Sequence, residues 1–456
     1  MHVAAGQVRE QPSDLLLIHA AELATCCSSP RCDGCSDGDG PRRGAAMGDI
    51  GIIRDGAIAV RSGVIVDVGN TQDVLAREPS GNSVGASDAT QVIDASGRTV
   101  LPGFVDAHTH LVFAGERYRE HVMRLSGAKY LDILAAGGGI LSTLTSTRSA
   151  SLSALVAGAM KRLDIMLLHG TTTVEAKSGY GLDIDTELRQ LEAAERASQA
   201  HPVDVVSTFM GAHALPPEFT GDPQGYLDFL ESAVLPAVEN QGIAEFCDVF
   251  CEEGVFSVEQ SRRVLLAGMK HGLRPKIHAD EIFPIGGAEL ASELAAVSAD
   301  HLAAASQEGI HSMARAGVAA VLLPATMFTL MSEAYADARD MIDAGVAVAL
   351  ATDFNPGTSP TMSMPFVITL ACLQMKMTPA EAVCAATLNA AWAIGRGDRA
   401  GAIQVGRDAD FIVCDVPAVD ALPFSVGVNP VRDVVKRGAH VVTSVGGGGR
   451  LCHSRI

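Results

Sequence analysis

The sequence predicts an α/β protein: a (β/α)8 barrel of the TIM type with a small β-sandwich domain formed from both chain ends. In the middle of the chain, short apolar runs that end in polar residues alternate with longer amphipathic stretches, as in repeated strand–helix units. At both ends, apolar and polar residues alternate between turn signals, which is typical of short strands. A chain of 456 residues is long enough for two or three domains.

The two chain ends are expected to pair in one β domain beside the barrel. Segments 57–70 and 90–103 read as strand–turn–strand patterns, and the same texture returns at 401–417 and 432–446. We therefore divide the chain into an N-terminal part of the β domain, a catalytic barrel and a C-terminal part of the β domain: 1–100, 101–395 and 396–456.

Eight candidate strands cover the central part, and eight such units close a barrel. In chain order they are residues 103–110, 170–178, 205–213, 245–252, 275–281, 298–302, 319–324 and 348–355. Amphipathic patterns predict helices between or after them at 184–200, 257–272 and 378–395.

Composition and charge exclude several classes of protein. The formal net charge is −19, and there is no cluster of Lys and Arg to neutralise nucleic-acid phosphates. The apolar stretches are too short and interrupted to span a bilayer, and the first residues lack the pattern of a signal peptide. We therefore expect a cytoplasmic protein with reduced thiols that binds neither nucleic acid nor membranes.

Four cysteines near the N-terminus are a local exception: Cys26, Cys27, Cys32 and Cys35. The last two have the C-x-x-C spacing of zinc and redox sites, but no second pair follows at finger spacing. Because the surrounding stretch is rich in Ser, Asp and Gly, we interpret it as a solvated insertion rather than a metal site.

Ionisable residues end most of the predicted barrel strands. His108 and His110 are two residues apart, so on a strand they project from the same face and can bind one metal ion together. Later strands end in further groups of this kind: Glu175, Lys177, His213, His278, His301 and Asp353. Because the carboxyl ends of barrel strands converge on one pocket, we expect these side chains to meet there.

Three imidazoles and one carboxylate of this set suit a zinc-like ion: His108, His110, His278 and Asp353. They leave a position for a water molecule, whose pKa the ion lowers toward ~7. The histidine pair alone could be a hydrogen-bonded strand end, but ligands on two later strands favour a metal. His301 is either a core histidine or a catalytic one, and catalysis requires a partner that fixes its tautomer.

Glu281 and Lys177 are two further candidates. Glu281 follows His278 by three residues, where it could cap the next helix or transfer protons near the metal, and we favour an acid–base or substrate-binding role. A modified lysine bridges two metals in some barrel hydrolases. Lys177 belongs to the second predicted strand and the fourth supplies no lysine, so we expect a single metal and a structural or electrostatic Lys177.

Several segments resemble the amidohydrolase superfamily, metal-dependent hydrolases on a distorted (β/α)8 barrel: PGFVDAHTH, HADE and ATDFNPG. The more specific segments GERYRE, KSGYG and DFNPGT are similar to the imidazolonepropionase family, ring-opening hydrolases of histidine degradation. The resemblance covers residues from about 100 to 390 and extends to the strand-rich ends. Only the cysteine-bearing stretch, about residues 24–46, departs from it.

The resemblance implies a cyclic amide hydrolase that opens 4-imidazolone-5-propanoate to N-formimidoyl-L-glutamate. It also implies one divalent or trivalent metal ion, zinc or iron, and a homodimer. The family's metal ligands fall on His108, His110, His278 and Asp353. Its substrate-contacting positions fall on Arg117, Tyr180, His213, Glu281, Asn355, Gly357 and Thr358. The residues expected to act in catalysis are Glu281, His301 and Asp353.

The chemistry of these residue types agrees with the resemblance. Arg117 can offer a bidentate fork to the carboxylate tail of the substrate, although an ordinary ion pair with Glu116 or Glu120 is the alternative. Tyr180 and Thr358 can orient a small polar ring or serve as loop hydrogen-bonders.

The other expected roles concern the backbone and the transfer of protons. Gly357 would let the backbone approach the ligand, or simply form a turn. His213 is expected to stabilise the oxyanion. Asp353 would receive a proton from the attacking water, while Glu281 with His301 would orient that water or protonate the departing nitrogen.

Two rival functions remain open at this point. A deaminase on the same scaffold could act on a purine, pyrimidine or triazine ring, but a neutral ring would not need the cation of Arg117. A non-catalytic barrel that binds metal or ligand, or serves as an assembly subunit, would need neither an open coordination position nor Glu281.

Overall fold

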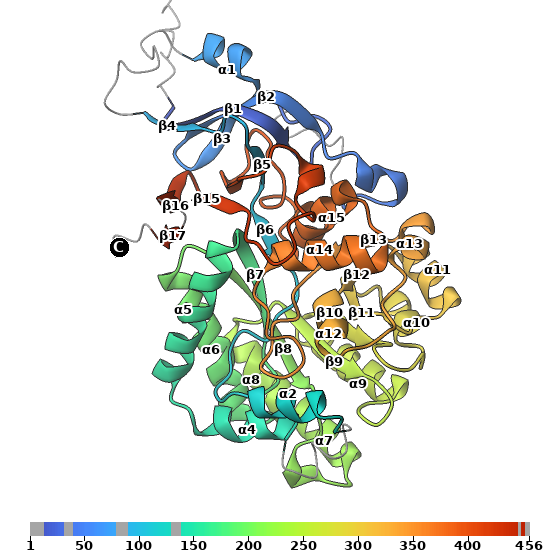
Figure 1. Ribbon diagram of the computed structural model, residues 1–456. Helices are drawn as coiled ribbons and strands as arrows, with labels where there is room; N and C mark the ends of the chain where they lie inside the picture. Colours follow the sequence, from blue (N-terminus) through green and yellow to red (C-terminus); the bar gives the residue numbers. More distant parts are fainter. Residues whose placement is uncertain (1–12, 32–39, 79–89, 129–137, 446–447, 452–456) are drawn as a thin grey trace, which may run out of the picture.

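The fold is given by a computed structural model, in which a barrel lies below a β domain built from both chain ends (Figure 1). The structure describes residues 13–31, 40–78, 90–128, 138–445 and 448–451. Cys32 and Cys35 lie outside these residues. Cys26 is a buried free thiol whose Sγ lies 3.4 Å from the hydroxyl of Thr387.

Eight parallel strands form the centre of the molecule and confirm the predicted barrel. Hydrogen bonds join them in unbroken sequence order from β6 to β13, and a bridge between Thr109 and Phe354 brings the first strand beside the last. Their bounds are β6 (Phe104–Asp106), β7 (Thr171–Lys177), β8 (Asp204–Ala212), β9 (Phe246–Cys251), β10 (Arg274–Ala279), β11 (Ser298–His301), β12 (Ala319–Leu322) and β13 (Ala347–Leu350).

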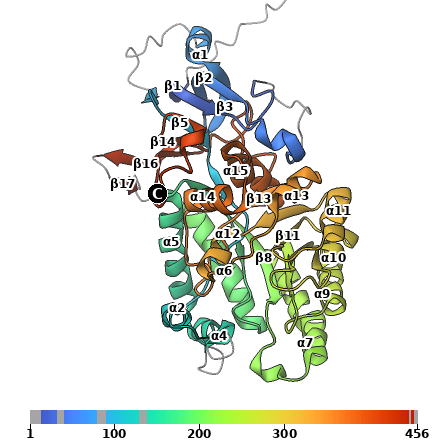
Figure 2. The same cartoon turned by 45° about the vertical axis from the view of Figure 1, so that its right-hand side comes forward.

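Helices surround the barrel, and Figure 2 shows α9, α10 and α11 along one side. The helices up to the sixth strand are α2 (Tyr118–Leu125), α4 (Ile140–Ser149), α5 (Leu152–Leu168), α6 (Ile184–Ala200), α7 (Pro223–Phe229), α8 (Leu235–Gln241), α9 (Val258–Lys270) and α10 (Gly287–Glu293). The later ones are α11 (Gln307–Ala316), α12 (Pro324–Thr329), α13 (Ala338–Asp343), α14 (Met364–Met375), α15 (Pro379–Ala386) and α16 (Leu388–Ala393). None of the described helices combines the length and apolar composition needed to cross a membrane.

Local capping explains where two of the predicted helices begin. The side chain of Asp183 accepts a hydrogen bond from the first turn of α6. Ser257 and Gln260 form a reciprocal capping box at the start of α9. Both helices therefore begin within a residue of the positions expected from the sequence.

The third predicted helix, over 378–395, is instead two helices that break at Thr387. The backbone of Thr387 lies at φ −129° and ψ −91°, outside the helical region, and its hydroxyl bonds the carbonyl of Val383. The break turns α16 so that the side chain of Asn389 bonds the carbonyls of Arg42 and Val348. Amphipathic spacing does not reveal this break.

The β domain expected from both chain ends is confirmed, and its strands belong to one hydrogen-bonded nine-stranded sheet. Antiparallel pairing of β5 with β14 joins the two ends, with Leu101 opposite Ile412. The strands are β1 (Leu15–Ala24), β2 (Ile52–Arg61), β3 (Val64–Asn70), β4 (Gln91–Asp94), β5 (Thr99–Pro102), β14 (Phe411–Cys414), β15 (Val431–Lys436), β16 (Ala439–Val445) and β17 (Gly448–Leu451). One helix, α1 (Thr71–Arg77), follows β3.

Candidate metal centre and active site

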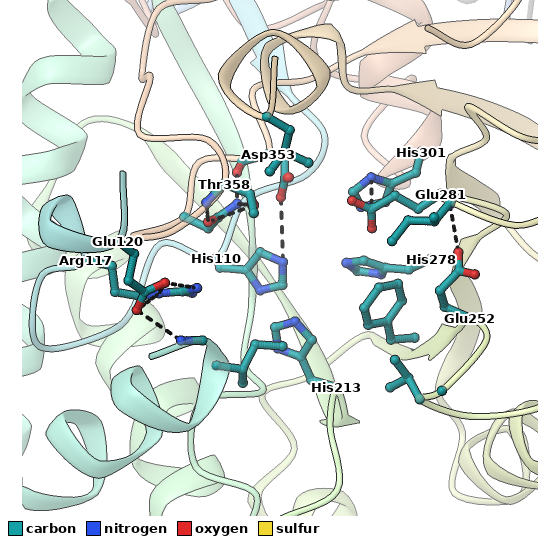
Figure 3. Close-up of a pocket in the computed structure, with 18 of the residues that line it drawn as sticks. His110, Arg117, Glu120, His213, Glu252, His278, Glu281, His301, Asp353 and Thr358 are labelled. Atoms are coloured by element: carbon teal, nitrogen blue, oxygen red, sulfur yellow. Dashed lines mark hydrogen bonds and ion pairs between the residues drawn. The ribbon is translucent and has the colours of Figure 1, made fainter. Parts of the chain in front are cut away.

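The barrel closes where the predicted metal ligands lie. The amide of Asp353 donates a hydrogen bond to the carbonyl of His108 (3.0 Å), and the amide of His110 donates to the carbonyl of Phe354 (2.8 Å). His278 arrives from β10, with its ring centroid 4.5 Å from that of His108. The structure thus brings the four predicted ligands together, and Figure 3 shows His110, His278 and Asp353 pointing into the same pocket.

Two of the histidines are oriented by buried carboxylates. Oδ2 of Asp300 lies 2.7 Å from Nδ1 of His108, and Oδ1 of Asp248 lies 3.1 Å from Nδ1 of His278. Because an ionised carboxylate only accepts hydrogen bonds, each Nδ1 carries the proton and each Nε2 offers a lone pair. Both Nε2 atoms are buried without a hydrogen-bond partner among the described residues, as expected of metal ligands.

Asp353 completes a donor set that fits a metal ion. Its Oδ1 lies 3.5 Å from Nε2 of His108, while its Oδ2 accepts a hydrogen bond of 2.6 Å from Thr326. Ligand atoms of His108, His110 and Asp353 lie within 4.8 Å of one another. Burial holds the pKa of both these histidines well below its usual range, so the rings are neutral as ligation requires. Imidazole and carboxylate donors of this kind suit zinc or iron.

His301 lies closer to the ligands than the sequence indicated. It forms a second group with His108 and His278, again with ligand atoms within 4.8 Å of one another. Three strand ends of the site also have backbone in the left-handed region: Asp280 at φ 49°, His301 at 78° and Asp353 at 52°. This conformation is costly for residues other than glycine and is concentrated at functional sites.

Glu281 lies beside His301, but the two side chains are not hydrogen-bonded. Its Oε2 is 3.6 Å from Nδ1 of His301, beyond hydrogen-bond distance. Burial, with repulsion from Asp353 and Glu252, raises the pKa of Glu281 to about 8. Glu252 accepts hydrogen bonds of 2.9 and 3.2 Å from the backbone N–H groups of the two residues after Glu281, and so holds the turn that carries it.

Arg117 pairs with Glu120, and both side chains are more than nine-tenths buried. Nε and Nη2 of the guanidinium contact the carboxylate at 3.0 and 2.8 Å. The pair is therefore part of the pocket wall rather than a surface ion pair. A Cβ at Gly357 would lie 2.3 Å from Nη1 of Arg117, so the absence of a side chain there makes room for the guanidinium.

The loop after β7 places Tyr180 in the pocket by wrapping around a buried carboxylate. Glu187 of α6 accepts hydrogen bonds of 2.8 to 3.0 Å from three backbone N–H groups between residues 179 and 182. The side chain of Gln190 accepts another from the amide of Tyr180. The position of Tyr180 is thus set by the helix that follows it.

His213 follows β8, and its ring stacks on His110 with centroids 4.8 Å apart. Its Nδ1 lies 3.1 Å from the carbonyl of Gly179, which can only accept, so Nδ1 carries a proton. Burial, with repulsion from His278, lowers the pKa of His213 to about 3. The neutral ring therefore offers Nε2 as an acceptor, whereas the expected stabilisation of an oxyanion requires a donor.

Asn355 organises the turn that holds the remaining predicted residues. Its Oδ1 accepts hydrogen bonds from the amides of Gly357 (2.8 Å) and Thr358 (2.7 Å). Its Nδ2 donates to the carbonyl of Asp353 (2.8 Å). This side chain therefore joins the turn of residues 355–358 to the backbone of Asp353.

One cavity of about 730 Å³ joins these groups, a volume that suits a small molecule. The predicted residues that line it are His110, Arg117, Tyr180, His213, His278, Glu281, His301, Asp353, Asn355 and Thr358. The sequence patterns did not single out Asp248, Glu252, Asp300 and Thr326, and they offered Glu120 only as a possible partner of Arg117. The sequence does contain a signal for Asp248 and Asp300. Each is a charged residue inside an apolar strand, and such a residue is rarely buried without a partner.

The fold and site define a (β/α)8 barrel with a candidate single-metal centre at the carboxyl ends of its strands. The sequence pattern of the amidohydrolase family matches residues 99–442. The imidazolonepropionase of Geobacillus kaustophilus is 54% identical over 87% of this chain and 92% of its own. That of Brevibacillus brevis is 51% identical over 93% and 97%. This chain belongs to the amidohydrolase family and, within it, to the imidazolonepropionase family.

The fold is shared with more distant solved structures. A zinc-bound adenosine deaminase from Xanthomonas campestris superposes with a TM-score of 0.63, covering 95% of this chain and 94% of that one at 20% sequence identity. At this identity the likeness concerns the fold alone.

Proposed function

We propose that this chain opens the cyclic amide of 4-imidazolone-5-propanoate and releases N-formimidoyl-L-glutamate, a step of L-histidine degradation. The observation that carries the proposal is a single cavity with a metal donor set and a buried guanidinium. The substrate has the two matching features, a ring carbonyl for a Lewis acid and a carboxylate tail for an arginine. The high identity to imidazolonepropionases supports the same reaction.

One metal ion, zinc or iron, would be held by His108, His110, His278 and Asp353. The unpartnered Nε2 atoms of His108 and His278 support this assignment. When bound, the ion would supply a Lewis acid for the carbonyl and lower the pKa of a water molecule toward ~7.

The substrate is proposed to lie between this centre and Arg117. Nε and Nη2 of the guanidinium pair with Glu120. Nη1, on the side of Gly357, would bind the carboxylate tail. Tyr180 and the turn of residues 355–358 would orient the ring. His213 would accept a hydrogen bond from a ring N–H, because its Nδ1 already donates to a carbonyl.

Proton transfer is assigned to Glu281, His301 and Asp353. Asp353 would receive a proton from the attacking water. The raised pKa of Glu281, about 8, keeps this carboxyl protonated near neutral pH, as a general acid for the departing nitrogen must be. His301 lies beside it and would orient the reacting groups.

The proposal extends to the setting of the enzyme. A small molecule is its substrate, and we propose a cytoplasmic homodimer that binds neither nucleic acid nor membranes.

One preparation tests both metal and substrate. Metal analysis of the purified protein should give about one zinc or iron per chain, and the protein should remove the absorbance of imidazolonepropionate. If the protein binds metal but leaves this absorbance unchanged, imidazolonepropionate is not its substrate.

Arg117→Ala distinguishes the proposal from a deaminase. Loss of a charged hydrogen bond costs ~1.5–3 kcal/mol, so KM should rise about 10- to 100-fold. Because this variant leaves Glu120 buried without its partner, the double variant Arg117→Ala with Glu120→Ala is the control. Unaltered substrate affinity in both variants would favour a deaminase.

A further inference from the structure

Three carboxylates surround the ammonium of Lys177 in a compact group behind the candidate metal ligands. Lys177, Glu175, Asp248 and Asp300 are all at most 1% exposed. Nζ of Lys177 lies 2.7 Å from Asp248, 3.0 Å from Glu175 and 3.2 Å from Asp300. An ammonium has three N–H groups, which matches the three carboxylates around it.

Two of these carboxylates also orient the histidines. The two oxygens of Asp248 have different partners: Oδ2 faces Lys177 and Oδ1 faces Nδ1 of His278. Oδ2 of Asp300 faces both Lys177 and Nδ1 of His108, while its Oδ1 accepts a hydrogen bond from Ser298. Lys177 is therefore one side chain away from each of two imidazoles that come from different strands.

The charge balance of the group explains why a cation is needed between the three carboxylates. Three buried carboxylates without a cation would repel one another in a medium of low dielectric constant. Although burial by itself lowers the pKa of Lys177, attraction to Asp248, Glu175 and Asp300 raises it above its usual value. The ammonium is thus charged and holds the carboxylates at the distances that reach the histidines.

We propose that Lys177 is a positioning residue of the metal site: it bridges Asp248 and Asp300 and so sets the orientation of His278 and His108 together. Partners that orient metal-binding histidines change metal affinity by about 10- to 100-fold when they are lost. Lys177 acts on two such partners from one position. This inference rests on the proposed metal site, but not on the identity of the substrate.

Lys276 offers a matched control in the same interior. It is also fully buried, and its Nζ lies 3.2 Å from Glu175 and 3.1 Å from the carbonyl of Ala393. Its direct partners are thus Glu175 and a backbone group, and its charge acts on Asp300 without a direct contact. Lys177→Met and Lys276→Met remove the same charge and preserve similar side-chain length.

The experiment measures the metal dissociation constant of the full chain by competition with a chromophoric chelator, with Zn²⁺ as the probe. Lys177→Met should weaken binding about 10- to 100-fold, whereas Lys276→Met should weaken it much less, because Lys276 does not contact either aspartate directly. The visible absorption spectrum of Co²⁺-loaded protein should change in Lys177→Met only, because it reports ligand geometry. Equal affinities and spectra for Lys177→Met and the wild type would overturn the inference, as would equal losses in both lysine variants.

A charge-balanced variant keeps the test decisive if Lys177→Met does not fold. Glu175→Gln with Lys177→Met removes one negative and one positive charge, so the net charge of the group is unchanged. It should fold and still show the weakened affinity and the altered Co²⁺ spectrum, and wild-type values in this folded variant would overturn the inference. Failure of the wild type itself to bind Zn²⁺ would instead refute the proposed metal site.

Discussion

The two sides of the barrel differ in what they bury. Strands β7, β9, β10 and β11 contain five charged side chains that are at most 1% exposed: Glu175, Lys177, Asp248, Lys276 and Asp300. Strands β12 and β13 contain only Ala, Val and Leu. Burial of ions costs free energy unless partners compensate it. The charged side is the one whose carboxylates face His108 and His278, two of the proposed metal ligands.

The contrast suggests that the apolar strands and the charged strands contribute to different properties of the barrel. The apolar strands pair in parallel, with Leu322 opposite Leu350, and both side chains are fully buried. Such strands contribute to stability through burial of apolar area. The charged strands carry the carboxylates that face two of the proposed metal ligands, His108 and His278. If this division holds, variants on the two sides should fail in different ways.

His278→Ala should have the largest effect on activity. It removes one imidazole donor, and a catalytic metal contributes several kcal/mol, so turnover should fall by ~10⁴-fold or more. Metal content should also fall, while the far-UV circular dichroism spectrum should remain that of a folded barrel. A variant that retains full metal content would show that His278 is not a ligand.

Glu281→Gln should lower turnover by ~10²–10⁴-fold through loss of proton transfer, while metal content stays that of the wild type. A general acid is active in its protonated form, so wild-type activity should decline as pH rises through the pKa of Glu281, about 8. This decline should be absent from the pH profile of the variant. Turnover that is essentially intact with metal bound would remove Glu281 from the mechanism.

Leu350→Ala tests the apolar side. It should lower the free energy of unfolding by ~2–5 kcal/mol through a cavity in the core, as measured by urea denaturation, and leave Zn²⁺ affinity unchanged. Leu373 is 61% exposed, so Leu373→Ala should cost less than ~0.5 kcal/mol. Loss of metal affinity in Leu350→Ala would contradict the separation of tasks.

Thr326→Val should have the smallest effect among the variants at the proposed metal centre. Its hydroxyl donates to Oδ2 of Asp353, and one hydrogen bond to a charged group is worth ~1.5–3 kcal/mol. We expect Zn²⁺ binding to weaken by about tenfold, the lower end of that range. Thr326→Ser keeps the hydroxyl and should bind Zn²⁺ like the wild type, so equal affinities for both variants would exclude this role.

Much of the site could be predicted because its residues end strands. The histidine pair, His278 and Asp353 each follow an apolar run in the sequence, and the ends of parallel barrel strands meet by geometry. The orientation of each ring could not be predicted in this way. From the sequence, either Glu116 or Glu120 could form an ion pair with Arg117. In the folded chain the partner is Glu120, which only the packing of the pocket wall determines.

The sequence alone determined the repeated units, the strands at the chain ends and the residues able to bind a metal, because these depend on local periodicity and residue type. The tertiary structure decided which carboxylates meet His108 and His278, which carboxylates surround Lys177 and which carbonyls Asn389 bonds. These features depend on the register of neighbouring strands and on contacts between residues far apart in the chain. Local patterns do not specify such contacts.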